Sequence, residues 1–146
     1  MTSSDYDTLV AAAARRDADA AAMVEASLQR YRPFDPKRSY TPLEREPYDA
    51  LCDRYLRAVE MAIRYFRTVE RARLAVNSES YRDLLGQAAK WGLIADVDLW
   101  FRMRDLRNRI AHDYLPEHLL RIYTAINEEF GPELLRLRQR LWQAAT

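Results

Sequence analysis

One stretch in the second half of the chain organises the rest, and it reads Leu99-Trp-Phe-Arg-Met-Arg-Asp-Leu-Arg-Asn-Arg-Ile-Ala-His-Asp-Tyr114. Its apolar residues recur at spacings of four, three and four, at Leu99, Met103, Leu106 and Ile110. At about 100° per residue, these positions form one stripe along a helix, and such a stripe predicts a helix that faces a core. The polar residues of the stretch fall beside the stripe, so they do not interrupt it.

The same geometry places the polar residues on two neighbouring flanks of this helix. One flank is expected to hold Trp100, Arg107, Ala111 and Tyr114. The other flank is expected to hold Arg104, Asn108 and His112, which are each four residues apart. Asp96 is a suitable N-cap, so we expect the helix over residues 97–112. Asp105 has helical spacing for an ion pair with Arg102 or Arg109.

Similar patterns cover the remainder of the chain, which has only three glycines in 146 residues. Helices are expected over residues 4–30, 47–76, 79–91, 97–112 and from residue 116 onward. No segment has the alternating pattern of a strand. The sequence therefore predicts an all-α protein, an antiparallel bundle of five to six helices that forms a single domain over residues 1–146.

Caps and prolines set the expected helix boundaries. Ser4 is the expected cap of the first helix, and Thr41-Pro42-Leu43-Glu44 has the pattern of a helix start. Pro47 follows about one turn later, so we expect a short turn there and a new long helix from Pro47. Gly92 is expected to end the short helix in the left-handed conformation. Gly131-Pro132 is expected to break or bend the last helix.

Charge and composition exclude several classes of protein. The chain has 23 Lys and Arg against 22 Asp and Glu, so any surface for nucleic acid must be a local patch. Cys52 is the only cysteine, and His112 and His118 are the only histidines. These counts argue against a disulfide framework and a zinc site, so we expect no metal and no cofactor. His118 is expected to face solvent.

The segment over residues 47–76 also carries arginines outside its apolar row, at Arg54, Arg57, Arg64, Arg67 and Arg71. They either form a solvated surface or extend a surface for RNA. No apolar run approaches the roughly 18 residues that are needed to cross a bilayer. The first residues lack the basic and apolar regions of a signal peptide. A cytoplasmic protein without membrane contact is therefore expected.

The segment Arg107-Asn-Arg-Ile-Ala-His112-Asp-Tyr114 has the pattern R-N-x-x-x-H-x-Y. It resembles the signature of HEPN domains, in which an Arg and a His are separated by four to six residues. The tyrosine two residues after the histidine resembles the HepT subgroup, whose members are toxins paired with minimal nucleotidyltransferases. The resemblance implies a helical bundle, an endoribonuclease toxin, and a cognate minimal nucleotidyltransferase antitoxin as partner.

The residue types suit cleavage of RNA without a metal, because the RNA 2′-hydroxyl can attack its own phosphate. A histidine, with an ordinary pKa near 6.5, can transfer protons at neutral pH. An arginine can bind phosphate oxygens through its planar guanidinium. We therefore expect Arg107, His112 and Asn108 to be catalytic, and Arg104 and Arg107 to bind RNA phosphate. The sequence does not indicate whether the RNA is tRNA or mRNA.

Arg107 and His112 are five residues apart, so a straight helix separates them by about 140°. Either the helix unwinds at His112, or a second subunit completes the site. The HEPN resemblance implies a homodimer whose motif helices face each other across a shared cleft. We expect an interface that includes residues 100–114 of both chains.

The resemblance also implies that the partner nucleotidyltransferase transfers AMP to Tyr114. The alternative is that Tyr114 only packs at the end of its helix. The function expected overall is a metal-independent endoribonuclease toxin that this modification silences. The alternative function is a non-catalytic HEPN subunit that binds a nucleotide or acts as a scaffold for its nucleotidyltransferase.

Overall fold

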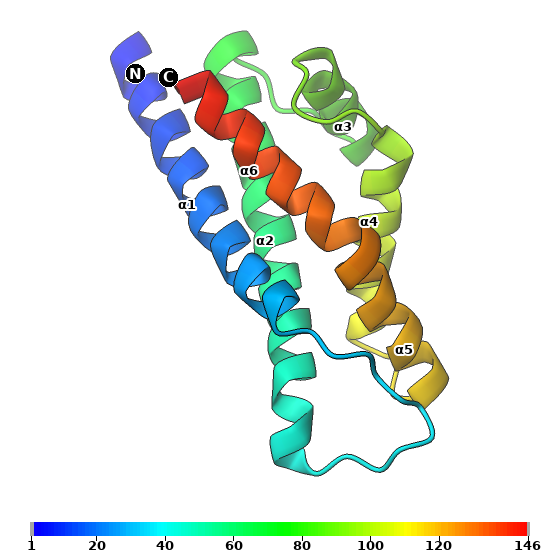
Figure 1. The fold of residues 1–146 in the computed structure, drawn as a ribbon. Coiled ribbons are helices and arrows are strands. Elements are labelled where there is room, and N and C mark those ends of the chain that lie inside the picture. Colours follow the sequence, from blue (N-terminus) through cyan, green and yellow to red (C-terminus); the bar gives the residue numbers. More distant parts are fainter. Residues whose placement is uncertain (1, 146) are drawn as a thin grey trace.

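The computed structural model describes residues 2–145, with side chains to Leu141, and no strand occurs among these residues. The helices are α1 (Ser3–Gln29), α2 (Pro42–Leu74), α3 (Tyr81–Lys90), α4 (Val97–Ile110), α5 (Pro116–Ala125) and α6 (Gly131–Ala145). A π-helical turn, η1 (Ile126–Phe130), joins α5 to α6 without a break. The predicted all-α bundle is confirmed. Helices α1 and α2 form a long antiparallel pair, with α6 beside α1 and with α3 and α4 on the other side of α2 (Figure 1).

Two helices begin with reciprocal capping boxes. In α2, the Thr41 side chain accepts from the Glu44 N–H, and the Glu44 carboxylate accepts from the Thr41 N–H at 3.0 Å, as the sequence predicts. In α1, the cap is Thr2 with Asp5, so the prediction of Ser4 as the cap is wrong. Thr2 makes both hydrogen bonds of the box, which lets the helix begin earlier.

The prolines interrupt the helices less than expected. Helix α2 passes through Pro47 without restarting. The missing proline N–H leaves the carbonyl of Leu43 without a helical partner, and Leu43 is 74% exposed, so water can take that place. At Gly131-Pro132 the chain stays helical, and the Gly131 N–H bonds to the Ile126 carbonyl across the wider π turn.

Gly131 also allows α1 to approach α6 closely. A Cβ at this position would lie 2.6 Å from the Ile126 carbonyl oxygen and 2.9 Å from a methyl carbon of Leu28 in α1. Both distances are too short for a side chain, so glycine is required there. Gly92 has φ +75 after α3, which confirms the predicted left-handed conformation.

Helix α4 lies against the core on the predicted stripe. Leu99, Met103 and Leu106 are buried and Ile110 is half-buried. Asp96 caps the helix through the Leu99 N–H at 3.2 Å, as predicted. Trp100 is fully buried as well, so it belongs to the core and not to an interface between chains.

Three neighbouring helices fix the position of α4. The Tyr55 hydroxyl of α2 donates to the Met103 carbonyl at 2.7 Å. The Trp100 indole N–H donates at 2.9 Å to Glu133 of α6, whose carboxylate is almost completely buried. The Tyr81 hydroxyl of α3 lies 3.5 Å from the Trp100 carbonyl oxygen. Helix α4 is therefore a rigid support for the residues at its end.

Candidate functional site

The arginine of the motif lies in helix α4, whereas the histidine lies in the turn that follows it. Arg107 belongs to the last turn of α4, which ends at Ile110. The N–H groups of His112 and Asp113 both donate to the Arg109 carbonyl, at 3.0 and 2.9 Å, in a turn that closes the helix. The expectation of a helix to residue 112 is therefore wrong, and His112 lies just beyond it.

Tyr114 lies still further along, on the linker to α5. The expectation that it returns to the flank of Arg107 is wrong, because α4 ends four residues before it. The following proline explains the early end: Leu115 precedes Pro116 and takes the extended conformation that this position favours, with φ −71 and ψ 133. Tyr114 is 81% exposed, so packing does not cover its hydroxyl.

The motif side chains share an open surface. Arg107, Asn108, His112 and Tyr114 are all exposed. Among the described residues, no hydrogen bond joins Arg107, Asn108 and His112 to one another. The structure thus places these exposed groups in the last turn of α4 and in the linker that follows it.

Arg104 has a different environment from its predicted neighbours Asn108 and His112. Its guanidinium lies 4.4 Å from the centre of the Tyr81 ring and 5.3 Å from that of Phe101. The contact with Tyr81 joins α4 to α3, whereas Phe101 belongs to α4 itself. Burial raises the pKa of the Tyr81 hydroxyl to about 12, against the opposing effect of the nearby charges on Arg104 and Arg107.

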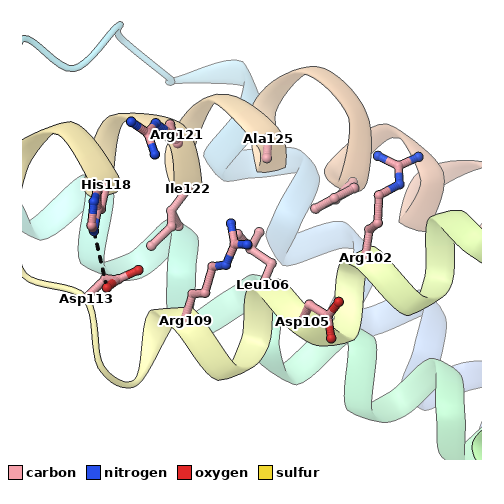
Figure 2. Close-up of a pocket in the computed structure, with 10 residues that line it drawn as sticks. Arg102, Asp105, Leu106, Arg109, Asp113, His118, Arg121, Ile122 and Ala125 are labelled. Carbon is pink, nitrogen blue, oxygen red and sulfur yellow. Dashed lines mark hydrogen bonds and ion pairs between the residues drawn. The ribbon is translucent and has the colours of Figure 1, made fainter.

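A pocket of about 500 Å³ between α4 and α5 was not predicted from the sequence (Figure 2). Its floor is apolar, from Leu106, Ile122, Ala125 and Phe130, and its polar lining comes from Arg102, Asp105, Arg109, Asp113, His118 and Arg121. His118 is half-buried and its Nδ1 lies 3.4 Å from Asp113, so the prediction that it faces solvent is wrong. The sequence did contain a signal for this ion pair, because Asp113 and His118 are only five residues apart on either side of Pro116.

This pocket opens on a different side of α4 from Arg107. Arg102 is already paired with Glu129 at 2.9 Å, and not with Asp105 as its helical spacing suggested. Arg109 extends from α4 toward the space between the two helices (Figure 2), and Arg121 of α5 also lines the pocket. Cationic groups above an apolar floor suit an anion with an apolar part, such as a nucleotide.

Comparison with known proteins identifies the family. A family model described as "Nucleotidyltransferase substrate binding protein like" matches residues 16–143. The chain belongs to this family. It is also similar to "Probable ribonuclease HepT" of Haemophilus influenzae (strain ATCC 51907 / DSM 11121 / KW20 / Rd), at 34% identity over 68 residues, 44% of this chain and 47% of the relative.

The chain thus spans about half the length of the curated relative it matches. No solved structure matches it at a significant level. Together, the family model and the HepT relative confirm the resemblance to HepT-like HEPN proteins.

The described residues also bear on metal binding and on membrane insertion. No group of three or more His, Cys, Asp or Glu side chains is arranged to hold a metal ion in that part of the chain. None of the described helices is both long and apolar enough to span a membrane.

Proposed function

We propose that the chain is a metal-independent endoribonuclease toxin of a HEPN and minimal nucleotidyltransferase pair. The observation that carries the proposal is the exposure of Arg107, Asn108, His112 and Tyr114 at one end of a rigidly held helix. If this end of α4 had no catalytic role, an Arg, an Asn, a His and a Tyr would not be needed there in the order of the HEPN signature. The similarity to a protein named as a probable ribonuclease supports the same reading.

The reaction needs only groups that this chain carries. The RNA 2′-oxygen attacks the adjacent phosphorus, the bond from phosphorus to the 5′-oxygen breaks, and a 2′,3′-cyclic phosphate and a 5′-hydroxyl result. His112 takes the proton of the 2′-hydroxyl or gives one to the leaving 5′-oxygen. Arg107 stabilises the negative charge on the phosphate oxygens, and Asn108 orients the phosphate or the imidazole.

A homodimer follows from the proton transfers. One transfer requires a base and the other an acid, and each chain brings one motif histidine to this surface. The second histidine, His118, lies in the pocket between α4 and α5. In the proposed dimer, the ends of two α4 helices face each other, and one His112 acts as base while the other acts as acid.

The decisive test is cleavage of RNA by the purified protein in excess EDTA. We expect the products to carry 2′,3′-cyclic phosphate ends, as mass spectrometry of the fragments can establish. We also expect growth to arrest when expression is induced in the absence of a partner. A protein that neither cleaves RNA nor arrests growth is not the proposed toxin.

The pocket between α4 and α5 favours a second candidate function, a nucleotide-binding subunit without catalysis. The family description, a substrate binding protein of nucleotidyltransferases, agrees with it. In that case calorimetry should detect ATP or AMP binding to the purified chain, and Arg109→Gln with Arg121→Gln should remove it. Nucleotide binding without RNA cleavage would favour this function over the first.

Replacement of Tyr114 tests the proposed control by AMP transfer. In that step the Tyr114 oxygen attacks the α-phosphorus of ATP, pyrophosphate leaves, and the phenol proton passes to a base of the partner enzyme. The new phosphodiester adds negative charge and bulk two residues from His112. With partner, ATP and Mg²⁺, we expect the wild-type chain to gain the mass of one AMP group and to lose cleavage.

Tyr114→Phe removes only the hydroxyl from an exposed ring, so the variant should fold, cleave RNA and arrest growth even when the partner is present. Peptide mass spectrometry identifies the modified residue. An unmodified Tyr114 in a fully neutralised sample would show that the partner inhibits by binding alone.

A further inference from the structure

The exposed face of α2 carries a row of arginines directed along the helix. Arg57, Arg64 and Arg71 are seven residues apart, so they follow one line, with about 10 Å between neighbours along the axis. All three are exposed. Two grooves open on this face, one toward α4 and one toward α1.

The groove toward α4 starts at the motif. It has a volume of about 390 Å³, and its charged lining consists of Arg107 with Asp53, Arg57, Glu60 and Arg64 of α2. Arg57 lies 3.5 Å from Asp53, and both side chains are exposed. Arg64 pairs with Glu60 at 2.8 Å, and the side chains of both are more than half exposed. An exposed pair of this kind contributes little to stability, so a phosphate can compete for the guanidinium.

The groove toward α1 continues from the first, because both contain Met61 and Arg64. It has a volume of about 300 Å³, and its cationic lining consists of Arg16 of α1 with Arg64, Arg67 and Arg71 of α2. None of the described residues that line it is acidic. Its floor contains apolar and aromatic side chains, Tyr6, Leu9 and Met61, of which Leu9 is 41% exposed.

We propose that these joined grooves, from Arg107 through Arg57, Arg64 and Arg71 to Arg16, form a track that binds single-stranded RNA next to the cleavage site. The proposal rests on the proposed function and names the path of its substrate. Guanidinium groups bind phosphates without regard to sequence, while Tyr6 and the apolar floor offer surfaces on which unpaired bases can pack.

The charge distribution favours RNA over a protein partner. The chain has a net charge of only +1, so binding to nucleic acid depends on a local excess of arginine. The groove toward α1 supplies that excess in one place. Arg64 pairs with Glu60, but two other arginines of this groove bond only to neutral groups: Arg67 donates to the Ser78 carbonyl at 3.4 Å, and Arg71 donates to the Asn77 side chain at 3.2 Å. These two arginines keep their full positive charge for phosphate.

The test compares two double variants with the same loss of charge. Arg16→Gln with Arg71→Gln changes the track, and Arg15→Gln with Arg30→Gln is the matched control, since Arg15 and Arg30 are exposed and line neither groove. Binding of a labelled single-stranded RNA of about 20 nucleotides is measured by fluorescence anisotropy between about 50 and 200 mM salt. Both double variants are made in an inactive His112→Ala chain.

We expect the track variant to bind at least about tenfold more weakly at 0.1 M salt, with a salt slope lower by about 1.4, or about 0.7 for each lost phosphate contact. The control should match the parent chain. In active chains, cleavage of a dinucleotide, which is too short to reach Arg16, should be equal in both variants. Equal binding of the long RNA by both variants overturns the track, whatever the cleavage result.

Two other outcomes distinguish a failure of the proposed function from a failure of the proposed RNA track. If long RNA binds through the track but no chain cleaves any RNA, the proposed function fails and the track stands. If sedimentation shows that the track variant alone loses a dimer, the face belongs to a second copy of the chain and the track is wrong.

Discussion

Cleavage of RNA is expected to fall about 100- to 10,000-fold when His112 is replaced by alanine, because the reaction then loses positioned proton transfer. The same change should leave helical content and thermal stability nearly unaltered, since His112 is exposed and lies beyond the end of α4. A fluorogenic RNA in EDTA measures the first effect and circular dichroism the second. Wild-type cleavage by the His112→Ala chain would refute the proposed mechanism.

His118→Ala is the matched control, because it removes the other histidine from the pocket between α4 and α5. It should retain cleavage of RNA. The shared site has its own test in mixed dimers: Arg107→Ala and His112→Ala chains are each inactive alone, and together they should recover part of the activity. No recovery in dimers shown to be mixed would place a whole site within one chain.

The second large effect concerns Asp17, which is buried in the middle of α1 with one carboxylate oxygen that lacks a hydrogen-bond partner. Burial raises the pKa of this carboxyl from 3.8 to about 7, although the charge of Arg138 opposes the change. The unfolded chain therefore releases this proton near pH 4, and the folded chain keeps it to about pH 7. Between these values the unfolded state binds fewer protons, so the contribution of Asp17 to stability becomes less favourable as the pH rises.

We expect the difference in unfolding free energy between Asp17→Asn and the wild-type chain to grow from about pH 4 to pH 7 in favour of the variant. It should then level off, after a total change of up to about 4 kcal/mol. Urea unfolding at a series of pH values measures it. Asp19→Asn, at an exposed position two residues away, is the control and should show no such trend. A flat difference for Asp17→Asn would mean that the folded chain holds this carboxylate ionised.

Helix periodicity and capping patterns predicted the parts of the fold that depend on residues close together in the sequence. The stripe of Leu99, Met103 and Leu106, the cap at Asp96 and the capping box at Thr41 involve residues within a few turns of one another, and the structure confirms them. The family could also be predicted, because its signature is a short segment of one helix and the turn after it.

Some errors were local, such as the cap of α1 and the end of α4, and other features depend on parts of the chain that are distant in sequence. The need for glycine at position 131 depends partly on how closely Leu28 of α1 approaches, and the sequence around Gly131 does not contain that distance. The pocket between α4 and α5 likewise depends on the angle between two helices. The contact of Arg104 with the Tyr81 ring could not be predicted for the same reason, because Tyr81 belongs to α3.

The linker over residues 111–115 carries two of the proposed functional side chains but contributes little to the core. Its side chains at His112 and Tyr114 are exposed, and only backbone hydrogen bonds to the Arg109 carbonyl tie its start to α4. Substitutions there cost little folding energy, so selection can act on them for activity or recognition alone. A change of His112 or Tyr114 can therefore alter the chemistry of this surface while the helical bundle beneath stays folded.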